Sequence, residues 1–226
     1  MKHVLVVDDE SHIREVVEYA LTREGYRVSL AADGQAALDL SSRVSPDLVV
    51  LDVMLPEIDG LEVCRQVRAG HPNLPIIMLT ALGEAEERIA GLEVGADDYV
   101  TKPFSPRELI LRIESVLRRS RDVPGPRLVL SSGSVALDTA ARVATRDGVE
   151  LPLTTREFDL LAFLMAHPGR AFSRTELMQH VWGWTFGDQS TVTVHVRRLR
   201  EKIEDDPTSP ALIKTVWGIG YRLEAA

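Results

Sequence analysis

The sequence predicts two domains of different class, a doubly wound α/β domain followed by a smaller α+β domain. In residues 1–119, short apolar runs alternate five times with helical patterns, which is the order of a parallel sheet covered by helices. In residues 127–226, short strand patterns separated by turns precede three helical patterns. Residues 120–126 carry two prolines and a glycine, cannot continue a helix, and are predicted to be a linker.

Five apolar runs are the candidate strands of the first domain. They are residues 4–7, 28–31, 48–51, 76–79 and 99–100. Between the first two runs, apolar residues recur at helical spacing from Ile13 to Leu21, and Gly25 follows as a stop signal. A similar helical pattern follows Pro106. We therefore expect a flavodoxin-like fold, in which ligands bind at the carboxyl ends of the strands.

The second domain begins with four candidate antiparallel strands. They are residues 128–130, 134–137, 142–145 and 149–151, with a hairpin turn at Asp147-Gly148. Thr154 and Ser173 each precede a glutamate by three residues, which is the capping box that starts a helix. A third helix is expected to begin near Asp188 or Ser190. Strands followed by helices in this order predict an α+β domain.

The composition limits the classes of protein that fit. The net charge is −8, but residues 1–119 carry 21 acidic and 13 basic residues, whereas the remainder carries 13 of each. The whole-chain charge therefore does not exclude nucleic acid as a partner of the second domain. The single cysteine, Cys64, excludes an internal disulfide, suits a reducing cytoplasm, and is expected to be buried. No apolar run approaches the ~18 residues that span a bilayer, so we expect a cytoplasmic protein without a membrane partner.

Polar residues follow the candidate strands at the edge where ligands are expected. Asp8 and Asp9 follow the first run, Asp52 the third and Thr80 the fourth, and Lys102 lies just past the fifth. Neighbouring carboxylates repel one another, so this cluster needs a hard divalent cation such as Mg²⁺, and Lys102 adds positive charge. The set suits phosphoryl transfer with Asp52 as nucleophile. Each aspartate taken singly is more simply a helix cap or a turn residue.

Four motifs in the first domain are typical of one protein family. They are Val6-Val7-Asp8-Asp9-Glu10, Leu51-Asp52-Val53-Met54-Leu55-Pro56, Met78-Leu79-Thr80-Ala81 and Gly95-Ala96-Asp97-Asp98-Tyr99-Val100-Thr101-Lys102-Pro103-Phe104. They resemble the receiver domains of two-component response regulators. Together with the second half, the chain resembles the OmpR/PhoB family of winged helix-turn-helix transcription factors. The resemblance runs from about residue 3 to residue 223.

The resemblance implies a role for each residue of the carboxylate cluster. Asp52 would accept a phosphoryl group from a sensor histidine kinase. Asp9, Asp52 and the carbonyl of Met54 would hold Mg²⁺ or another divalent cation such as Mn²⁺. Asp8 would act on the cation through water, and the amide of Met54 would bind a phosphoryl oxygen.

It also implies roles at the ends of the fourth and fifth strands. Lys102 would pair with the phosphoryl group, and the prolyl peptide after it is typically cis in this family. The hydroxyl of Thr80 and the amide of Ala81 would bind other phosphoryl oxygens. Thr80 and Tyr99 match the switch pair of the family, in which Thr80 moves to the phosphate and Tyr99 turns inward. From the residues alone, Tyr99 is an ordinary half-buried strand aromatic.

Residues around the fourth and fifth helices form a candidate dimer surface. The charged members are Arg88, Asp97, Asp98, Glu108, Arg112 and Arg119, and the apolar members are Ile89, Leu92 and Ile110. Both charge signs are present, as a symmetric interface requires, and the positions match the dimer surface of the family. The alternative is a solvated helical face, on which ion pairs contribute little.

Residues 190–203 are predicted to form a recognition helix that enters a major groove. An apolar stripe of Val192, Val196, Leu199 and Ile203 should pack inward. The candidate DNA-contacting residues are Thr191, Val194, His195, Arg197, Arg198 and Arg200 on the helix, with Arg222 in the hairpin that follows. No acidic residue lies between 189 and 200, although an arginine-rich helix is by itself more often a solvated surface.

The hairpin near the C-terminus resembles the wing of the family. Residues 214–217 and 221–223 flank the turn at Gly218-Ile219-Gly220. Two residues depart from the family pattern: Ser190 stands where arginine is common, and Trp217 stands where an arginine often enters the minor groove. The resemblance therefore leaves a minor-groove contact of the wing open. Trp182 and Trp184 are expected to be packing residues.

These features predict a DNA-binding response regulator that is not an enzyme, since the receiver would catalyse only its own phosphorylation and dephosphorylation. Phosphorylation of Asp52 would favour a receiver homodimer and raise the affinity for double-stranded promoter DNA, with RNA polymerase as a further partner. An aspartate-nucleophile phosphatase would need a second carboxylate where Met54 stands. The other alternative, a winged-helix regulator that works without phosphorylation, predicts a broken pocket, whereas Asp9, Thr80 and Lys102 are all present.

Overall fold

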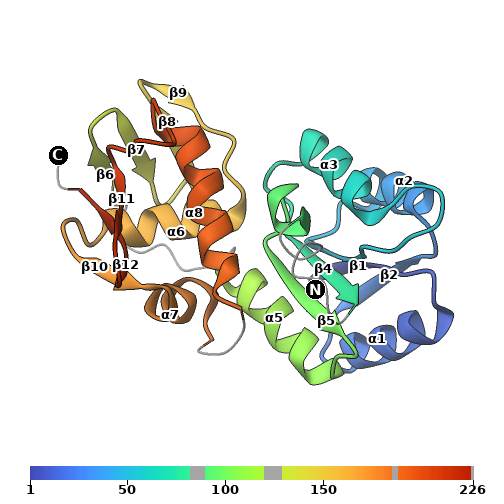
Figure 1. Cartoon of the computed structure of the whole chain (residues 1–226). Coiled ribbons are helices and arrows are strands. Elements are labelled where there is room, and N and C mark those ends of the chain that lie inside the picture. The colour runs from blue at the N-terminus through green and yellow to red at the C-terminus, as the bar shows by residue number, and fades with distance from the viewer. Residues whose placement is uncertain (82–89, 120–128, 185–187, 225–226) are drawn as a thin grey trace. The chain divides into compact units, whose positions relative to one another are not determined.

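A computed structural model of the chain describes residues 1–81, 90–119, 129–184 and 188–224 (Figure 1). Contacts between residues divide the chain into two compact units, Met1–Ser120 and Arg121–Ala226. The expected linker, residues 120–126, lies outside the described residues. Among the described helices, none combines the length and the apolar character that a membrane crossing requires.

The first unit is built on a parallel sheet of five strands in the order β2-β1-β3-β4-β5. The strands are β1 (His3–Val7), β2 (Arg27–Ala31), β3 (Leu48–Asp52), β4 (Ile76–Ala81) and β5 (Asp98–Lys102). All five apolar runs of the sequence form strands. The strands β1 and β3 are buried along their whole length, and β4 is buried up to Ala81, as a sheet covered on both faces requires. The expected flavodoxin-like fold is confirmed.

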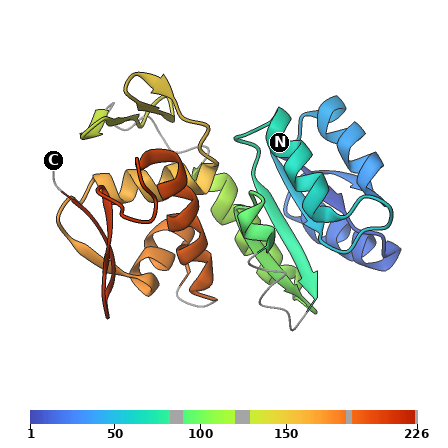
Figure 2. The ribbon, with the colours of Figure 1, turned by 45° about the horizontal axis from the view of Figure 1, so that its top comes forward.

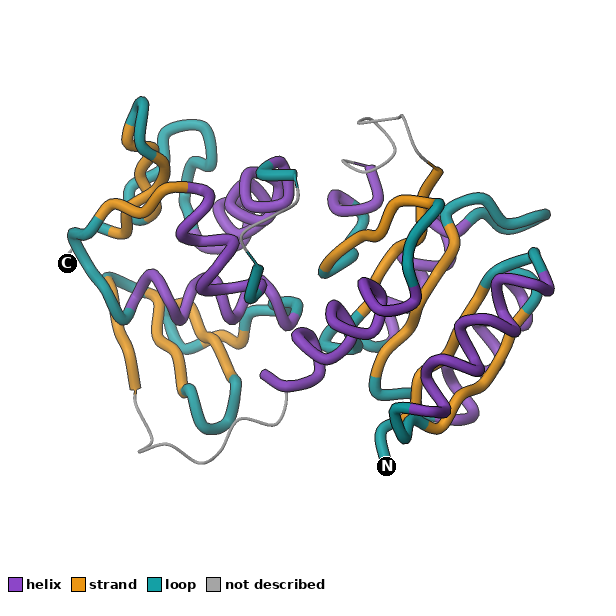
Figure 3. The backbone as a smooth tube through the Cα atoms, turned by 90° about the horizontal axis from the view of Figure 1, so that it is seen from below, coloured by secondary structure: helices purple, strands orange, loops and turns teal. Residues whose placement is uncertain are grey.

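Helices cover both faces of this sheet. They are α1 (Ser11–Arg23), α2 (Gly34–Val44), α3 (Gly60–Gly70) and α5 (Pro106–Arg119). Helices α2 and α3 lie on the face that comes forward in Figure 2, whereas α1 and α5 lie on the face seen from below in Figure 3. Under α1 and α5, a core joins Val17, Leu21 and Ile113 to the strands. Cys64, on α3, is fully buried as expected.

The second unit begins with an antiparallel sheet in the order β6-β7-β8-β9. Its strands are β6 (Val129–Ser132), β7 (Val135–Asp138), β8 (Val143–Arg146) and β9 (Val149–Glu150). Three helical segments follow, α6 (Thr155–Met165), α7 (Arg174–Leu177) and α8 (Ser190–Ile203), and α7 continues as a π-helix, η1 (Met178–Trp182). Thr154 and Ser173 form the expected capping boxes. The α+β order is confirmed.

A second sheet of three strands closes this unit. It contains β10 (Ala171–Ser173), β11 (Ile213–Val216) and β12 (Gly220–Leu223) in the order β10-β12-β11. The sequence did not predict β10, since three residues are too few for an alternating pattern. Gly220 pairs with Ser173, and a Cβ at Gly220 would lie 2.1 Å from the carbonyl oxygen of Phe172. Only glycine fits where β12 passes β10 so closely.

The core of the second unit confirms two packing predictions. The apolar stripe of α8 is buried in it, namely Val192, Val196, Leu199 and Ile203. Trp182 and Trp184 are buried in the same core. Helix α8 is therefore anchored by the side that the sequence pattern indicated.

Candidate functional site

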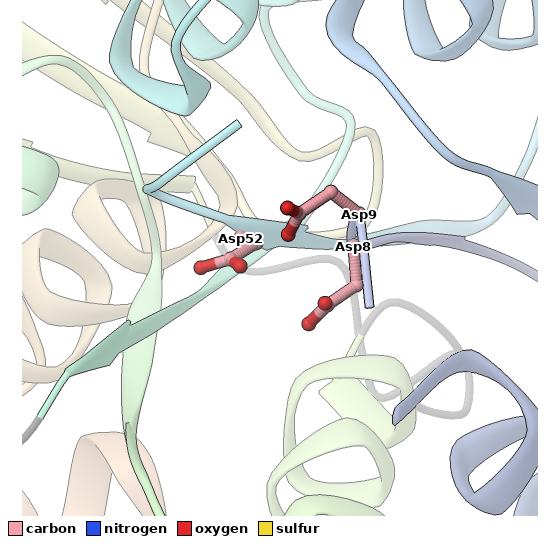
Figure 4. A group of neighbouring side chains, drawn as sticks. All are labelled: Asp8, Asp9 and Asp52. Atoms are coloured by element: carbon pink, nitrogen blue, oxygen red, sulfur yellow. The ribbon is translucent and has the colours of Figure 1, made fainter. Parts of the chain in front are cut away.

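Three aspartates meet at the carboxyl ends of β1 and β3. Asp8 and Asp9 follow the last residue of β1, and Asp52 is the last residue of β3 (Figure 4). Carboxylate oxygens of the three residues lie within 4.8 Å of one another. Asp8 and Asp52 are buried, whereas Asp9 is exposed. The structure therefore brings together the cluster that the sequence predicted.

The ammonium group of Lys102, at the end of β5, neutralises part of this charge. Its Nζ lies 2.7 Å from Oδ2 of Asp52 and 2.8 Å from Oδ2 of Asp8, and 3.5 Å from Oε1 of Glu10. Burial disfavours the ammonium, but the contacts with Asp52 and Asp8 outweigh it and raise the pKa of Lys102. Lys102 therefore remains a cation that bridges two carboxylates from different strands.

Burial also disfavours the charged form of Asp52, which for a carboxylate means a higher pKa. It raises the pKa of Asp52 above its ordinary value, and the neighbouring charge of Asp8 acts in the same direction, while Lys102 opposes both. The backbone amide of Met54 donates to Oδ1 of Asp52 at 3.3 Å. A further cation near Asp52 would favour its ionised form, so an oxygen-rich metal site fits this arrangement.

Other predicted residues surround the cluster on neighbouring elements. Thr80, near the end of β4, is buried, and Ala81 after it is exposed. The side chain of Met54 is 63% exposed beside the cluster. Tyr99, on β5, is only 8% exposed, and so it is more deeply buried than a half-buried strand aromatic. The peptide between Lys102 and Pro103 is cis, as the resemblance implied.

The candidate dimer surface is only partly described. Arg88 and Ile89 and the side chain of Arg119 lie outside the described residues. Arg112 on α5 bridges Asp98 at 3.0 Å and Glu108 at 2.9 Å. Leu92 is fully buried and Ile110 is half-buried.

Asp97 differs from the other charged residues of this set. Its carboxylate lies 2.5 Å from the guanidinium of Arg68 on α3 and accepts a hydrogen bond from the amide of Ile76 at 2.9 Å. The side chain is fully buried. Asp97 thus joins α3 to the start of β4 inside the first unit, and it does not contribute to an exposed surface.

The predicted DNA-contacting residues of α8 separate into different environments. Arg197 is exposed and pairs with Glu201 at 3.1 Å. Thr191, Val194, His195 and Arg198 are buried. The Nδ1 atom of His195 is 2.8 Å from the carbonyl oxygen of Thr191, and its ring meets the ring of Trp182 edge-on. Arg198 pairs with the carboxylate of Glu157 at 2.8 Å.

The two remaining arginines make contacts that the sequence did not indicate. Arg200 donates to the carbonyl oxygen of Ile213 at 2.7 Å and to Oγ1 of Thr215 at 2.9 Å, so it ties α8 to β11. Arg222 on β12 pairs with Glu224 at 2.5 Å. These arginines therefore make structural contacts around α8 in addition to contributing positive charge.

Sequence reasoning missed two residues that position this region. Glu157 was recognised only as a capping residue, whereas its buried carboxylate also holds Arg198 and Lys202. Arg174 on α7 donates to Oγ1 of Thr193 at 3.2 Å and lies over the ring of Tyr221. No local pattern joins residues so far apart in the chain, and so no sequence signal identified these contacts.

Comparison with known proteins gives the same division of the chain. The family described as response regulator receiver domain matches residues 4–114, and the family described as transcriptional regulatory protein, C terminal, matches residues 148–223. The sensory transduction protein RegX3 of Mycobacterium tuberculosis is 45% identical over 227 residues, which cover 99% of this chain and 100% of that protein. The chain belongs to the OmpR/PhoB-type response regulators.

Further relatives agree with this assignment. The response regulator is 48% identical over 227 residues to the probable transcriptional regulator ycf27 of Pyropia yezoensis, covering 96% of this chain and 93% of the relative. Among solved structures, DrrB, an OmpR/PhoB homolog of Thermotoga maritima, is 35% identical with a TM-score of 0.54, and each chain is covered in full. A mutant of RitR has a TM-score of 0.79 at 27% identity, again over the full length of both chains. The predicted family and its general function in transcription regulation are confirmed.

Proposed function

We propose that Asp52 is the phosphoryl acceptor of this response regulator and that a sensor histidine kinase is the donor. One oxygen of the Asp52 carboxylate attacks the phosphorus of a phosphohistidine. The new P–O bond forms as the P–N bond breaks, and the leaving imidazole takes up a proton. The observation that carries this proposal is the position of Asp52 Oδ2, 2.7 Å from the Lys102 ammonium and beside two further carboxylates.

The neighbouring residues would hold a divalent cation and orient the phosphoryl group. Asp9, Asp52 and the Met54 carbonyl would bind Mg²⁺, or Mn²⁺, with Asp8 acting through water. The cation supplies positive charge that offsets the charge of the transferring phosphoryl group. All of these ligands offer oxygen, which supports a hard cation.

Four other groups would bind the phosphoryl oxygens, and the ring of Tyr99 would change position when they do. Lys102 would exchange its contact with Asp52 for the phosphoryl group, and the amides of Met54 and Ala81 would donate to it. The Thr80 hydroxyl would move to the phosphate while Tyr99 occupies the space behind it. The burial of Tyr99 supports an inward position for this ring.

An apolar pocket next to Lys102 supports a protein as phosphoryl donor. It has a volume of about 340 Å³ and lies between α1 and the start of α5, where Ile13, Val16, Phe104 and Pro106 line it. Its position beside the carboxylate cluster would let a helix of the kinase dock on apolar side chains while presenting its phosphohistidine to Asp52.

The test compares two aspartate variants of the full-length protein. Mg²⁺ and acetyl phosphate should add one phosphoryl mass to the wild type and to Asp59→Asn, which changes the exposed cap of α3 but keeps its capping ability. Asp52→Asn should gain none. Equal modification of Asp52→Asn would remove Asp52 as the acceptor, and an unmodified wild type would favour a regulator that works without phosphorylation.

The output of this site would be a receiver dimer. Asp98, Glu108 and Arg112 combine both charge signs on β5 and α5 and could exchange their partners across a two-fold axis. The proposed remainder of this interface is Ile89 and Ile110 with Arg88 and Arg119. Leu92, which the sequence placed in the same surface, is fully buried and would only support it from within. Dimerisation would place two DNA-binding domains on adjacent half-sites and raise their affinity through effective concentration.

The second domain would bind double-stranded promoter DNA through α8 and the β11–β12 hairpin. Exposed Arg197 supports a contact in the major groove, and Arg222 is placed to reach a phosphate once it leaves Glu224. Thr191, Val194 and Arg198 remain proposed contacts, whereas His195 is fully buried against Trp182 and would support the helix from inside the domain. The same proposal places the chain in the cytoplasm with RNA polymerase as a partner, with domain bounds at 1–119 and 127–226 and a linker between them.

A further inference from the structure

Arg14 holds the turn that carries two of the three clustered aspartates. Its Nη1 atom donates to the carbonyl oxygen of Asp8 at 2.6 Å and to the carbonyl oxygen of Asp9 at 2.9 Å. Arg14 lies in the first turn of α1 and is half-buried. The guanidinium therefore reaches back from the helix to the chain that leaves β1, and these two bonds go to backbone oxygens rather than to the carboxylates.

Helix α1 gives this guanidinium a fixed starting point. Val17 and Leu21 are buried in the core under α1, and Ile13 packs against the same core. Arg14 follows Ile13 directly, so packing on the sheet sets where its side chain begins. One nitrogen of the planar guanidinium carries two N–H bonds, which suits two carbonyl oxygens that lie close together.

The two aspartates depend on this backbone to different degrees. The carboxylate of Asp8 is buried and has contacts of its own, with the amide of Glu10 at 3.0 Å and with Nζ of Lys102 at 2.8 Å. Asp9 is exposed, so packing restricts its carboxylate little. The two peptide groups on either side of the Asp9 Cα are the ones whose carbonyl oxygens bind Arg14. Arg14 therefore sets the direction in which the Asp9 side chain leaves the backbone.

We propose that Arg14 is a positioning residue for the divalent cation, because it fixes both peptides around Asp9 and so directs the Asp9 carboxylate toward Asp52. Figure 4 shows this direction, and oxygens of the three carboxylates lie within 4.8 Å of one another. The inference rests on the cation site proposed above. Residues that orient metal ligands without touching the metal typically change metal affinity about 10- to 100-fold.

Positioning by Arg14 and the charge of Arg14 have opposite effects on cation binding. A guanidinium near a cation repels it, so charge alone would make Arg14 weaken the binding of the cation. Fixing the Asp9 carboxylate instead makes Arg14 strengthen that binding. The sign of the change in affinity on removing the guanidinium therefore decides between the two.

The first experiment measures the affinity for Mn²⁺ without a phosphoryl donor. The full-length protein is titrated with MnCl₂, and electron paramagnetic resonance measures the free ion. Arg14→Met removes the guanidinium but keeps an unbranched side chain with good helix propensity. The dissociation constant of Mn²⁺ should rise roughly 10-fold. An unchanged or lower dissociation constant would overturn the proposal. If the wild type itself binds no Mn²⁺, the cation site and this inference both fall.

Two controls separate position from charge and from a general loss of stability. Arg23→Met removes the same charge from an exposed arginine in the last turn of α1. Lys2→Met breaks the ion pair with Asp47, at 2.5 Å, beside the opposite end of β1. Both variants should bind Mn²⁺ as the wild type does. A loss of affinity in Lys2→Met equal to that in Arg14→Met would show that any weakening of the receiver has this effect, and the role of Arg14 would fall.

The second experiment separates cation binding from phosphoryl transfer. The rate of phosphorylation by acetyl phosphate is followed by intact mass over a range of Mg²⁺ concentrations. In Arg14→Met, the Mg²⁺ concentration that gives half the maximal rate should rise roughly 10-fold, and high Mg²⁺ should overcome the loss. A lower maximal rate at an unchanged half-saturating concentration would place Arg14 in the transfer step and overturn its role in cation binding.

Discussion

The guanidinium of Arg198 on α8 lies 2.8 Å from the carboxylate of Glu157, which is fully buried at the start of α6. The same carboxylate also accepts from Nζ of Lys202 at 2.6 Å and from the amide of Thr154 at 2.8 Å. One side chain therefore caps α6 and restricts how α8 can turn against it. A residue that contacts no DNA would in this way determine which side chains α8 presents.

We expect Glu157→Gln to destabilise the second unit. The amide keeps the shape of the side chain but leaves Arg198 and Lys202 without their counter-charge, at a cost of about 3 kcal/mol in the free energy of unfolding. Urea unfolding followed by tryptophan fluorescence measures it. The control is Glu201→Gln, whose exposed pair with Arg197 should contribute under about 1 kcal/mol. Equal losses in both variants would contradict the role of Glu157.

The contribution of Glu157 to the stability of the second unit should depend on pH. Burial opposes ionisation, but Arg198, Lys202 and the Thr154 amide together hold the pKa of Glu157 below its usual value. A depressed pKa in the folded state means that the contribution is full above the pKa of the unfolded chain and is lost as pH falls through the lower folded value. The difference in stability between wild type and Glu157→Gln should therefore shrink in acid.

His3 should make the receiver sensitive to mildly acidic pH. Nη2 of Arg27 lies 2.8 Å from Nδ1 of His3, and since arginine can only donate, Nδ1 must be unprotonated. Burial, followed by the charge of Arg27, lowers the pKa of His3. The neutral imidazole therefore stabilises the fold above about pH 6.5, and this stability is lost as pH falls below that value.

The measurement is the urea midpoint of receiver unfolding at pH 7.5 and pH 5.5. His3→Gln should lose less stability between these two values than the wild type does. His12→Gln, which alters an exposed histidine of α1, should behave as the wild type. An identical pH dependence in His3→Gln and the wild type would show that His3 does not carry it.

Two glycines of the wing should respond to alanine for different reasons. At Gly220 a Cβ would lie 2.1 Å from a carbonyl oxygen, so Gly220→Ala must separate β10 from β12. Gly218 has a φ of +75° with no atom near a Cβ, so Gly218→Ala costs only the strain of its backbone, about 1 kcal/mol. Thermal unfolding should show the larger loss for Gly220→Ala, and the reverse order would contradict the close approach.

Arg112→Ala should separate phosphorylation from dimerisation. Its guanidinium bridges Asp98 and Glu108 within one chain. We expect these two carboxylates to require Arg112 as an ion-pair partner in the proposed dimer as well. Intact mass should show full phosphorylation by acetyl phosphate, while light scattering should show a monomer. Arg107→Ala, an exposed arginine on the same helix, should still dimerise. A dimer of phosphorylated Arg112→Ala would exclude this residue from the interface.

The sequence predicted the elements well where one strong signal acts over a short range. The five strands of the receiver and the capping boxes at Thr154 and Ser173 follow from local apolar runs and local hydrogen bonding. Contacts between distant segments were not predictable in the same way. The sequence around Asp97 predicts a charged surface residue, and only the fold shows that this carboxylate is buried in an ion pair with Arg68. Likewise, the face of α8 is clear from its period, whereas the clamp from Arg200 to β11 is not.

The buried position of Cys64 makes the reactivity of its thiol a measure of how often the receiver opens. It is the only thiol of the chain, and α3 holds it fully out of solvent. A thiol-specific reagent can therefore reach this sulfur only when the receiver unfolds far enough to expose that helix, independently of the state of the DNA-binding domain. The opening motions of the two halves of the polypeptide can thus be distinguished, because the single thiol lies in one of them and the other has none.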